Sequence, residues 1–211
     1  MLTFALVSEG VCDQAVIEHL IQTTCEKILD CEIEVYPMQP LRDATDSSAN
    51  FGGWERVFEF CETGIPAALS VNDYVVIQID TDRAEHVKLG VSLQVGGVDR
   101  DIQLVTDDVV RRIASCFAGQ IPEELNARVI YAVSIHSIES WLLLLLFEDD
   151  HPKNSFDRLE RGLRRSNIKL VKTYDCYSSL IRPIKFKKIL GQQALGNSLS
   201  IFLQRVAAIT A

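Results

Sequence analysis

Acidic residues end or follow three apolar stretches of the sequence, and together they have the chemistry of a metal site. The stretches and their acidic residues are 2–8 with Glu9, 73–80 with Asp80 and Asp82, and 127–135 with Glu139. Carboxylates crowded at one place repel one another unless a positive charge lies between them. Carboxylate oxygens select Mg²⁺, Mn²⁺ or Ca²⁺, and the cysteines and histidines of this chain lack the spacing of a zinc site. If the three places meet, the sequence predicts a divalent-cation site.

The elements that would bring these residues together are buried strands alternating with amphipathic helices. Expected strands are 2–8, 31–36 (ending at Pro37), 74–80 and 128–135, and expected helices are 13–29, 54–65, 101–119, 136–147 and 199–208. Residues 38–53 are expected to form a loop, and residues 83–101 are expected to be irregular. Continuous apolar runs are typical of parallel strands covered on both faces, so the pattern predicts an α/β fold with a mostly parallel, Rossmann-like central sheet flanked by helices. Ligands bind outside the carboxyl ends of such strands, where the acidic residues fall.

Each acidic residue also has an ordinary structural interpretation. Asp13 could cap the helix expected from 13 to 29, and Asp82 or Thr81 could cap the segment that follows them. Glu139 could be a first-turn glutamate stabilised by the dipole of its helix. The metal interpretation rests on the presence of acidic residues at all three strand ends. It leaves open whether Asp13 is a metal ligand or a cap.

Charge divides the chain into an acidic and a basic part. Residues 1–150 contain 26 Asp and Glu against 9 Lys and Arg, a net charge of −17, whereas residues 151–211 contain 3 against 12, a net charge of +9. We expect an α/β domain over 1–150 and a basic, mainly helical C-terminal extension over 151–211, packed on it. The basic extension could hold a phosphate backbone, or it could dock on the acidic body or on an acidic partner.

Composition excludes several classes of protein. The chain has 211 residues, 47% of them hydrophobic, which suits one substantial globular domain. Its most apolar stretch, residues 141–147, is far shorter than the roughly 20 residues of a membrane span, so a buried helix is expected there. No signal peptide is evident, and the six cysteines form no paired motif, so we expect a cytoplasmic protein with free thiols. The P-loop motif is absent, so any ATP hydrolysis must come from another chain.

Two segments give the sequence a specific resemblance. "VSEGVCDQAVIEHLI" (7–21) and "VVIQIDTDR" (75–83) resemble the Toprim domain, in which a glutamate follows the first strand and a D-x-D pair follows a later one. Glu9, Asp80 and Asp82 match that pattern. The chain further resembles the OLD-family nucleases and small Toprim-like proteins of bacterial defence islands, which are often encoded beside an ATPase. Two further segments resemble motifs of the defence-island proteins. "IESWLL" (138–143) resembles their third acidic motif, which implies a role for Glu139, and "VKTYDCYSSLI" (171–181) resembles their lysine-bearing segment, which implies a role for Lys172.

The resemblance implies a metal-dependent nuclease. Glu9, Asp80 and Asp82, with Asp13 or Glu139, would hold two Mg²⁺ or Mn²⁺ ions, and Lys172 would offset developing negative charge. The implied partners are nucleic acid, with DNA favoured over RNA, and a separate ATPase subunit in an anti-phage system. The resemblance implies no membrane association, and it leaves open whether the protein forms a homo-oligomer. OLD nucleases usually carry glutamate where this chain has Asp13. The alternative is a catalytically weak or inactive Toprim-fold adaptor that binds the ATPase.

Overall fold

Four parallel strands form the centre of the molecule. The computed structural model of the protein describes residues 1–41 and 52–209. The strands are β1 (Leu2–Val7), β2 (Ile33–Gln39), β3 (Tyr74–Asp80) and β6 (Val129–Ser134), in the order β2-β1-β3-β6. All three pairings are parallel, which confirms the predicted α/β class and sheet. Residues 42–51, which belong to the loop expected over 38–53, lie outside the described residues.

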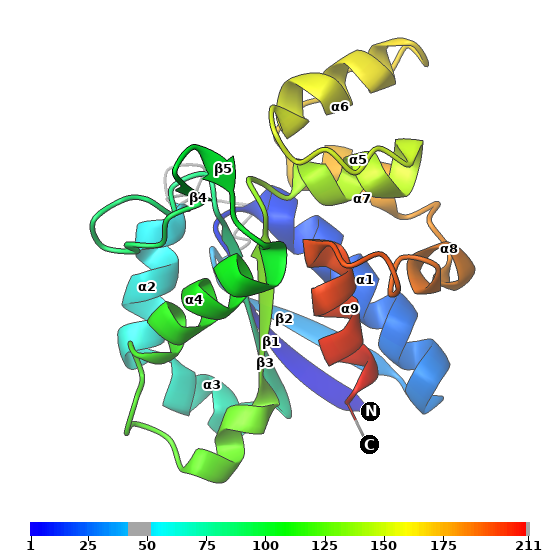
Figure 1. The fold of residues 1–211 in the computed structure, drawn as a ribbon. Helices are drawn as coiled ribbons and strands as arrows, with labels where there is room; N and C mark the ends of the chain where they lie inside the picture. The colour runs from blue at the N-terminus through cyan, green and yellow to red at the C-terminus, as the bar shows by residue number, and fades with distance from the viewer. Residues whose placement is uncertain (42–51, 210–211) are drawn as a thin grey trace.

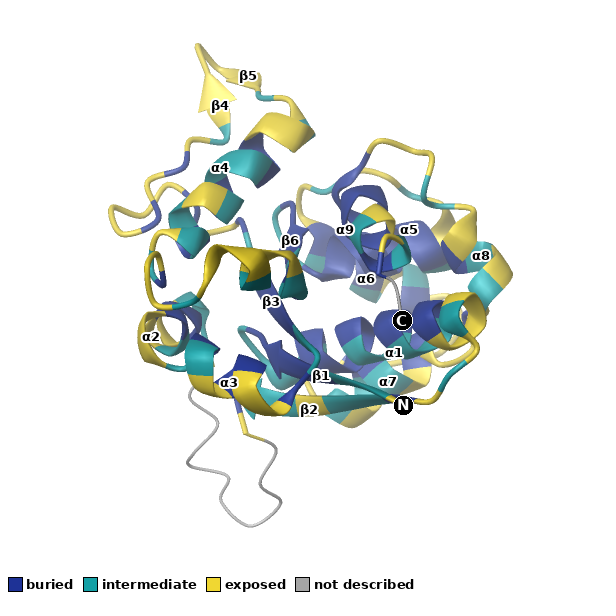
Figure 2. Ribbon diagram, turned by 90° about the horizontal axis from the view of Figure 1, so that it is seen from below, coloured by how far each residue is buried: buried dark blue, intermediate teal, exposed yellow. Residues whose placement is uncertain are grey.

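Helices cover both faces of the sheet (Figure 1). One side holds α1 (Val11–Leu29), α5 (Glu139–Phe147), α6 (Ser155–Arg164), α7 (Tyr174–Ile181), α8 (Phe186–Leu190) and α9 (Ser198–Ala207); the other holds α2 (Trp54–Thr63), α3 (Ile65–Val71) and α4 (Ile102–Ala114). Because successive strand residues point to opposite faces, Phe4 and Leu6 of β1 enter the first core while Ala5 and Val7 enter the second. Both faces are therefore buried, which explains the continuous apolar runs (Figure 2).

The helices of the basic C-terminal segment share a core with the rest of the chain. Leu159 of α6, Tyr177 of α7, Ile189 of α8 and Phe202 of α9 all lie in the core that α1 and α5 also fill. The apolar stretch 141–147 belongs to α5, and most of it is buried there. In the described part of the chain, no helix is both long enough and apolar enough to cross a membrane.

Two local predictions were wrong. The second strand does not end at Pro37 but continues to Gln39, because β2 is an edge strand whose register shifts at this point, and proline is tolerated at such positions. The segment 83–101 is not wholly irregular, since it contains the exposed hairpin of β4 (Gln94–Val95) and β5 (Val98–Asp99). Gly96 and Gly97 form its turn with φ of 60° and 78°, the backbone conformation that two-residue hairpins require.

The packing of α9 gives a stability prediction. Phe202 is fully buried, and its ring stacks on Trp141 of α5 with 5.4 Å between centroids. Phe202→Ala should lower the free energy of unfolding by about 3–5 kcal/mol, because it removes buried apolar area and leaves a cavity. Urea unfolding followed by circular dichroism measures this loss. Leu195→Ala, at a side chain that is 53% exposed, is the matched control and should change stability little; equal effects of the two changes would contradict the packing described.

Candidate functional site

A cleft of about 470 Å³ opens at the carboxyl ends of the parallel strands. The structure brings all six residues singled out from the sequence to its lining: Glu9, Asp13, Asp80, Asp82, Glu139 and Lys172. They come from the ends of β1 and β3, the first turns of α1 and α5, and the segment before α7. Residues separated by more than 160 positions therefore meet at one edge of the sheet.

Glu9 and Asp80 are held side by side through Gln78. The Glu9 backbone N–H donates to Gln78 Oε1 at 3.1 Å, and Gln78 Nε2 donates to Asp80 Oδ1 at 2.8 Å. The Asp80 backbone N–H in turn donates to Glu9 Oε1 at 2.7 Å. This closed ring of hydrogen bonds joins the ends of two neighbouring strands and fixes the position of both carboxylates.

Burial and mutual repulsion make these carboxylates hard to ionise. Burial, together with the charges of Asp13 and Asp82, raises the pKa of Glu9 to about 8, although the Asp80 backbone N–H partly offsets the rise. The pKa of Asp80 is raised by burial and then by the charges of Asp13, Glu9 and Glu139. At neutral pH the cluster therefore has an affinity for protons or for a cation in their place.

Asp13 lies in the first turn of α1 and is almost fully buried. Burial and the charge of Glu139 raise its pKa to about 7, and backbone N–H groups of Asp13 and Gly10 act in the opposite direction. The N-cap residue of α1 is Gly10, and a Cβ atom on Gly10 would come within 3.1 Å of Asp13 Oδ2. Asp13 thus stabilises the start of α1 and also faces the cleft, and its role as a metal ligand stays a prediction.

Glu139 is held by two hydroxyl groups that sequence patterns did not single out. Tyr177 of α7 donates to Glu139 Oε1 at 2.6 Å, and Ser137 donates to Oε2. Ser137 Oγ also lies 2.8 Å from Ser155 Oγ at the start of α6. Both oxygens of Glu139 therefore already have protein donors, so Glu139 is fixed as an anchor between three helices.

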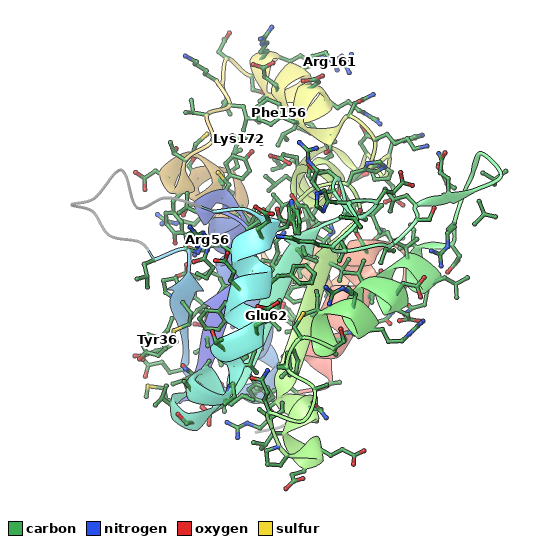
Figure 3. All side chains as sticks on the ribbon, turned by 90° about the vertical axis from the view of Figure 1, so that its left-hand side faces the viewer. Tyr36, Arg56, Glu62, Phe156, Arg161 and Lys172 are labelled. Atoms are coloured by element: carbon green, nitrogen blue, oxygen red, sulfur yellow. The ribbon has the colours of Figure 1, made fainter. Side chains whose placement is uncertain are left out.

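Lys172 is the only lysine or arginine lining the cleft in the part of the chain described here. Its Nζ lies 3.8 Å from Glu139 Oε1 and 4.9 Å from the centroid of the Phe156 ring. Figure 3 shows Lys172 and Phe156 close together. The Lys172 side chain is 66% exposed, so the ammonium group can reach a ligand that enters from solvent.

A hydrogen-bonded crosslink fixes the two loops that carry Asp82 and Glu139. The Thr81 N–H donates to the Ser134 carbonyl at 3.0 Å, and the Asp82 N–H donates to the His136 carbonyl at 2.9 Å. The His136 N–H donates to Thr81 Oγ1 at 2.7 Å. His136 has a φ of 64°, a conformation that few residues other than glycine adopt and that is often found at functional sites. Thr81 therefore serves as a crosslink between the loops.

The start of α2 reaches the cleft through two glycines. The Gly53 N–H donates to the Glu9 carbonyl at 2.6 Å, and a Cβ atom on Gly52 would lie only 2.0 Å from that same carbonyl oxygen. Any larger residue at Gly52 would therefore push the segment away from Glu9. The helices α1, α5 and α6 also begin beside the cleft, so several positive ends of helix dipoles are directed at one place.

The donor chemistry of the cleft suits a hard divalent cation. Its carboxylate oxygens are the ligands that Mg²⁺ and Mn²⁺ prefer. Cys12 also lines the cleft, but burial raises the pKa of its thiol to about 12, so it stays protonated and does not favour a soft metal. Within residues 1–41 and 52–209, no three His, Cys, Asp or Glu side chains are grouped closely enough to hold one ion. Binding of one ion by three of these side chains would therefore require rotation of a side chain toward the ion.

Comparisons with known proteins leave the family of the chain undetermined. No model of a known family matches the sequence, no curated protein matches it, and no solved structure matches the fold. The Toprim resemblance therefore stays a prediction.

The raised pKa values predict how stability depends on pH. The pKa of Glu9 and that of Asp13 lie above their ordinary values of 4.5 and 3.8, so the folded state binds more protons than the unfolded state. Their stabilising contribution is complete below about pH 4 and is lost as pH rises through about 7 to 8. The melting temperature in EDTA should therefore fall between pH 5 and pH 8.5.

Two variants isolate the contribution of Glu9. Glu9→Gln cannot ionise and should flatten this pH dependence, whereas Glu62→Gln, an exposed site on α2, should not. Mg²⁺ added at the high end of the pH range should restore the melting temperature of the unaltered protein. A melting temperature that rises with pH in EDTA would contradict the electrostatic description of the cleft.

Proposed function

We propose that the protein is a divalent-metal-dependent nuclease of Toprim type that hydrolyses phosphodiester bonds. The observation that carries the proposal is the meeting of Glu9, Asp80 and Asp82 with Lys172 in one cleft at the carboxyl edge of a parallel sheet. A cluster of buried carboxylates with raised pKa values is unfavourable by itself, so a cation that offsets the repulsion explains why the fold maintains it.

The residues of the cleft divide into ligands and supporting groups. Glu9, Asp80 and Asp82 would hold Mg²⁺ or Mn²⁺, with Asp13 as a further oxygen ligand. When bound, two such ions would stabilise the charge on the attacking and leaving oxygens of a phosphodiester. Lys172 would add positive charge beside the phosphate, as would the nearby starts of α1, α5 and α6. Gln78 and Tyr177 would act as positioning residues through Glu9, Asp80 and Glu139.

The substrate and the biological setting extend the same proposal. The substrate is nucleic acid, because a metal-loaded cleft and a basic C-terminal segment both attract phosphates. The preference for DNA over RNA rests on the resemblance alone. The resemblance to small Toprim-like proteins of bacterial defence islands supports a cytoplasmic anti-phage effector that works with a separate ATPase.

The alternative function is an adaptor that keeps the fold and binds the ATPase with little catalysis of its own. The observation in its favour is that protein donors already occupy Glu9 Oε1, Asp80 Oδ1 and both oxygens of Glu139. A site maintained only for structure would show the same hydrogen bonds, so cleavage of nucleic acid is the property that separates the two functions.

Removing one carboxylate tests the nuclease directly. Asp80→Ala should lower Mg²⁺- or Mn²⁺-dependent cleavage of plasmid by about 10²–10³-fold or more, the loss seen when a charge-stabilising group leaves a reacting centre. The melting temperature in EDTA should hold or rise, because one member of a repelling cluster is gone. Glu62→Ala removes an exposed carboxylate on α2, away from the cleft (Figure 3), and should leave cleavage unchanged. Undiminished cleavage or defence activity in Asp80→Ala would favour the adaptor.

A further inference from the structure

A second groove, of about 380 Å³, lies between α5 and α6 and is separate from the cleft. Its apolar floor consists of Leu143 and Phe147 of α5 and the backbone around Gly162 of α6. Gly162 allows the helices to approach closely, since a Cβ atom there would come within 2.8 Å of the Phe147 ring. Phe147 is nevertheless 42% exposed, so part of its ring faces the groove and solvent.

Arginines of α6 and its C-cap residue, Arg165, form the rim of this groove. Arg158 is paired with Asp149, which compensates its charge. Arg161 donates from Nε to the carbonyl of Asp157 in its own helix at 3.2 Å, and neither Arg161 nor Arg165 forms an ion pair within the described residues. The groove thus combines two uncompensated guanidinium groups with an exposed aromatic ring, although the protein as a whole has a net charge of −8.

The groove and the cleft are separate, but both border α6. Ser155 and Phe156, in the first turn of α6, line the cleft, whereas Arg161 and Arg165 line the groove. At 1.5 Å per residue, Arg161 lies roughly 8–9 Å further along the helix axis than Ser155. Figure 3 shows Lys172, Phe156 and Arg161 in this order toward the outer end of α6. The two sites are therefore close enough along α6 for one bound chain to reach both.

We propose that the groove between α5 and α6 holds a single-stranded segment of nucleic acid next to the phosphodiester in the cleft. This inference rests on the proposed function and names its substrate class. Guanidinium groups bind phosphates through paired hydrogen bonds, so Arg161 and Arg165 contact the backbone. Phe147 offers an exposed ring on which an unpaired base stacks, as in other grooves that bind single strands. The bases of a duplex are paired and stacked on each other, so they are not available to this ring.

Binding of labelled oligonucleotides in EDTA tests the inference without cleavage. The probe is a mixed-sequence single strand of about 12 nucleotides, compared with its duplex by fluorescence anisotropy at several salt concentrations. Arg161→Glu with Arg165→Glu should raise the Kd for the single strand by about tenfold or more. Loss of two phosphate contacts should also reduce the slope of log Kd against log salt by about 1.4.

A matched control changes the same amount of charge outside the groove. Arg164 is paired with Glu160 at 3.0 Å, and Lys169 is exposed in the segment after α6; neither lines the groove. Arg164→Glu with Lys169→Glu should therefore change the Kd much less than the groove variant. Phe147→Leu keeps an apolar side chain but removes the ring, so it should weaken single-strand binding by about fivefold or more and leave the salt slope unchanged.

Several outcomes would overturn the inference. Equal weakening by the groove variant and its control would show that only net charge matters. Equal affinity for duplex and single strand, or an unaltered Kd in Phe147→Leu, would reject stacking in the groove. Binding of a polyglutamate peptide that competes with the oligonucleotide at equal affinity would indicate an acidic protein partner instead.

The same measurements keep this inference separate from the nuclease proposal. Single-strand binding that depends on Arg161 and Arg165 in EDTA, without cleavage by the unaltered protein in Mg²⁺ or Mn²⁺, would reject the nuclease and retain the groove. Cleavage that depends on Asp80, with unaltered binding by the groove variant, would retain the nuclease and reject the groove.

Discussion

The closed ring of hydrogen bonds through Glu9, Gln78 and Asp80 is the interaction on which the rest of the site depends. It places two carboxylates side by side where β1 and β3 end. The link between the two carboxylates is Gln78, a polar residue in the apolar part of β3, and its side chain is fully buried. A buried amide is stable only when its hydrogen bonds are satisfied, and both ends of this amide are engaged. The sheet thus carries an internal polar contact whose purpose is to hold two acidic groups together.

The two cores on either side of the sheet make this arrangement possible. Repulsion among the carboxylates would separate mobile elements, but β1 and β3 are covered by helices on both faces and pair with each other. Tyr177 extends the support to the C-terminal helices, since its ring is fully buried and its hydroxyl group holds Glu139. Stability of the cores is therefore connected to the chemistry of the cleft, because α5, whose Trp141 stacks on Phe202 of α9, also carries Glu139.

Sequence reasoning predicted the parts of the structure that depend on local pattern. Uninterrupted apolar runs predicted a parallel sheet, and in a parallel sheet the residues that follow different strands meet at one edge. The shared location of Glu9 and Asp80 follows from this alone. Tyr177, Ser137 and His136 could not be found in this way, because their roles depend on contacts between distant segments. Gln78 did give a signal, as a polar residue inside an apolar strand on the same side as Asp80. The Gly96-Gly97 pair likewise is typical of a hairpin turn, but the segment around it has no clear strand pattern, so the hairpin was not predicted.

The central claim is that the carboxylate cluster binds a divalent cation, and a crystal structure of the protein soaked in Mn²⁺ tests it most directly. Anomalous density between Glu9 and Asp80, with carboxylate oxygens at about 2.0–2.6 Å, is the result this account predicts. The same density should be absent from crystals of Glu9→Gln with Asp80→Asn grown and soaked in the same way. Well-ordered Glu9 and Asp80 side chains in an intact ring of hydrogen bonds with Gln78, with no anomalous density between the two carboxylates, would contradict it.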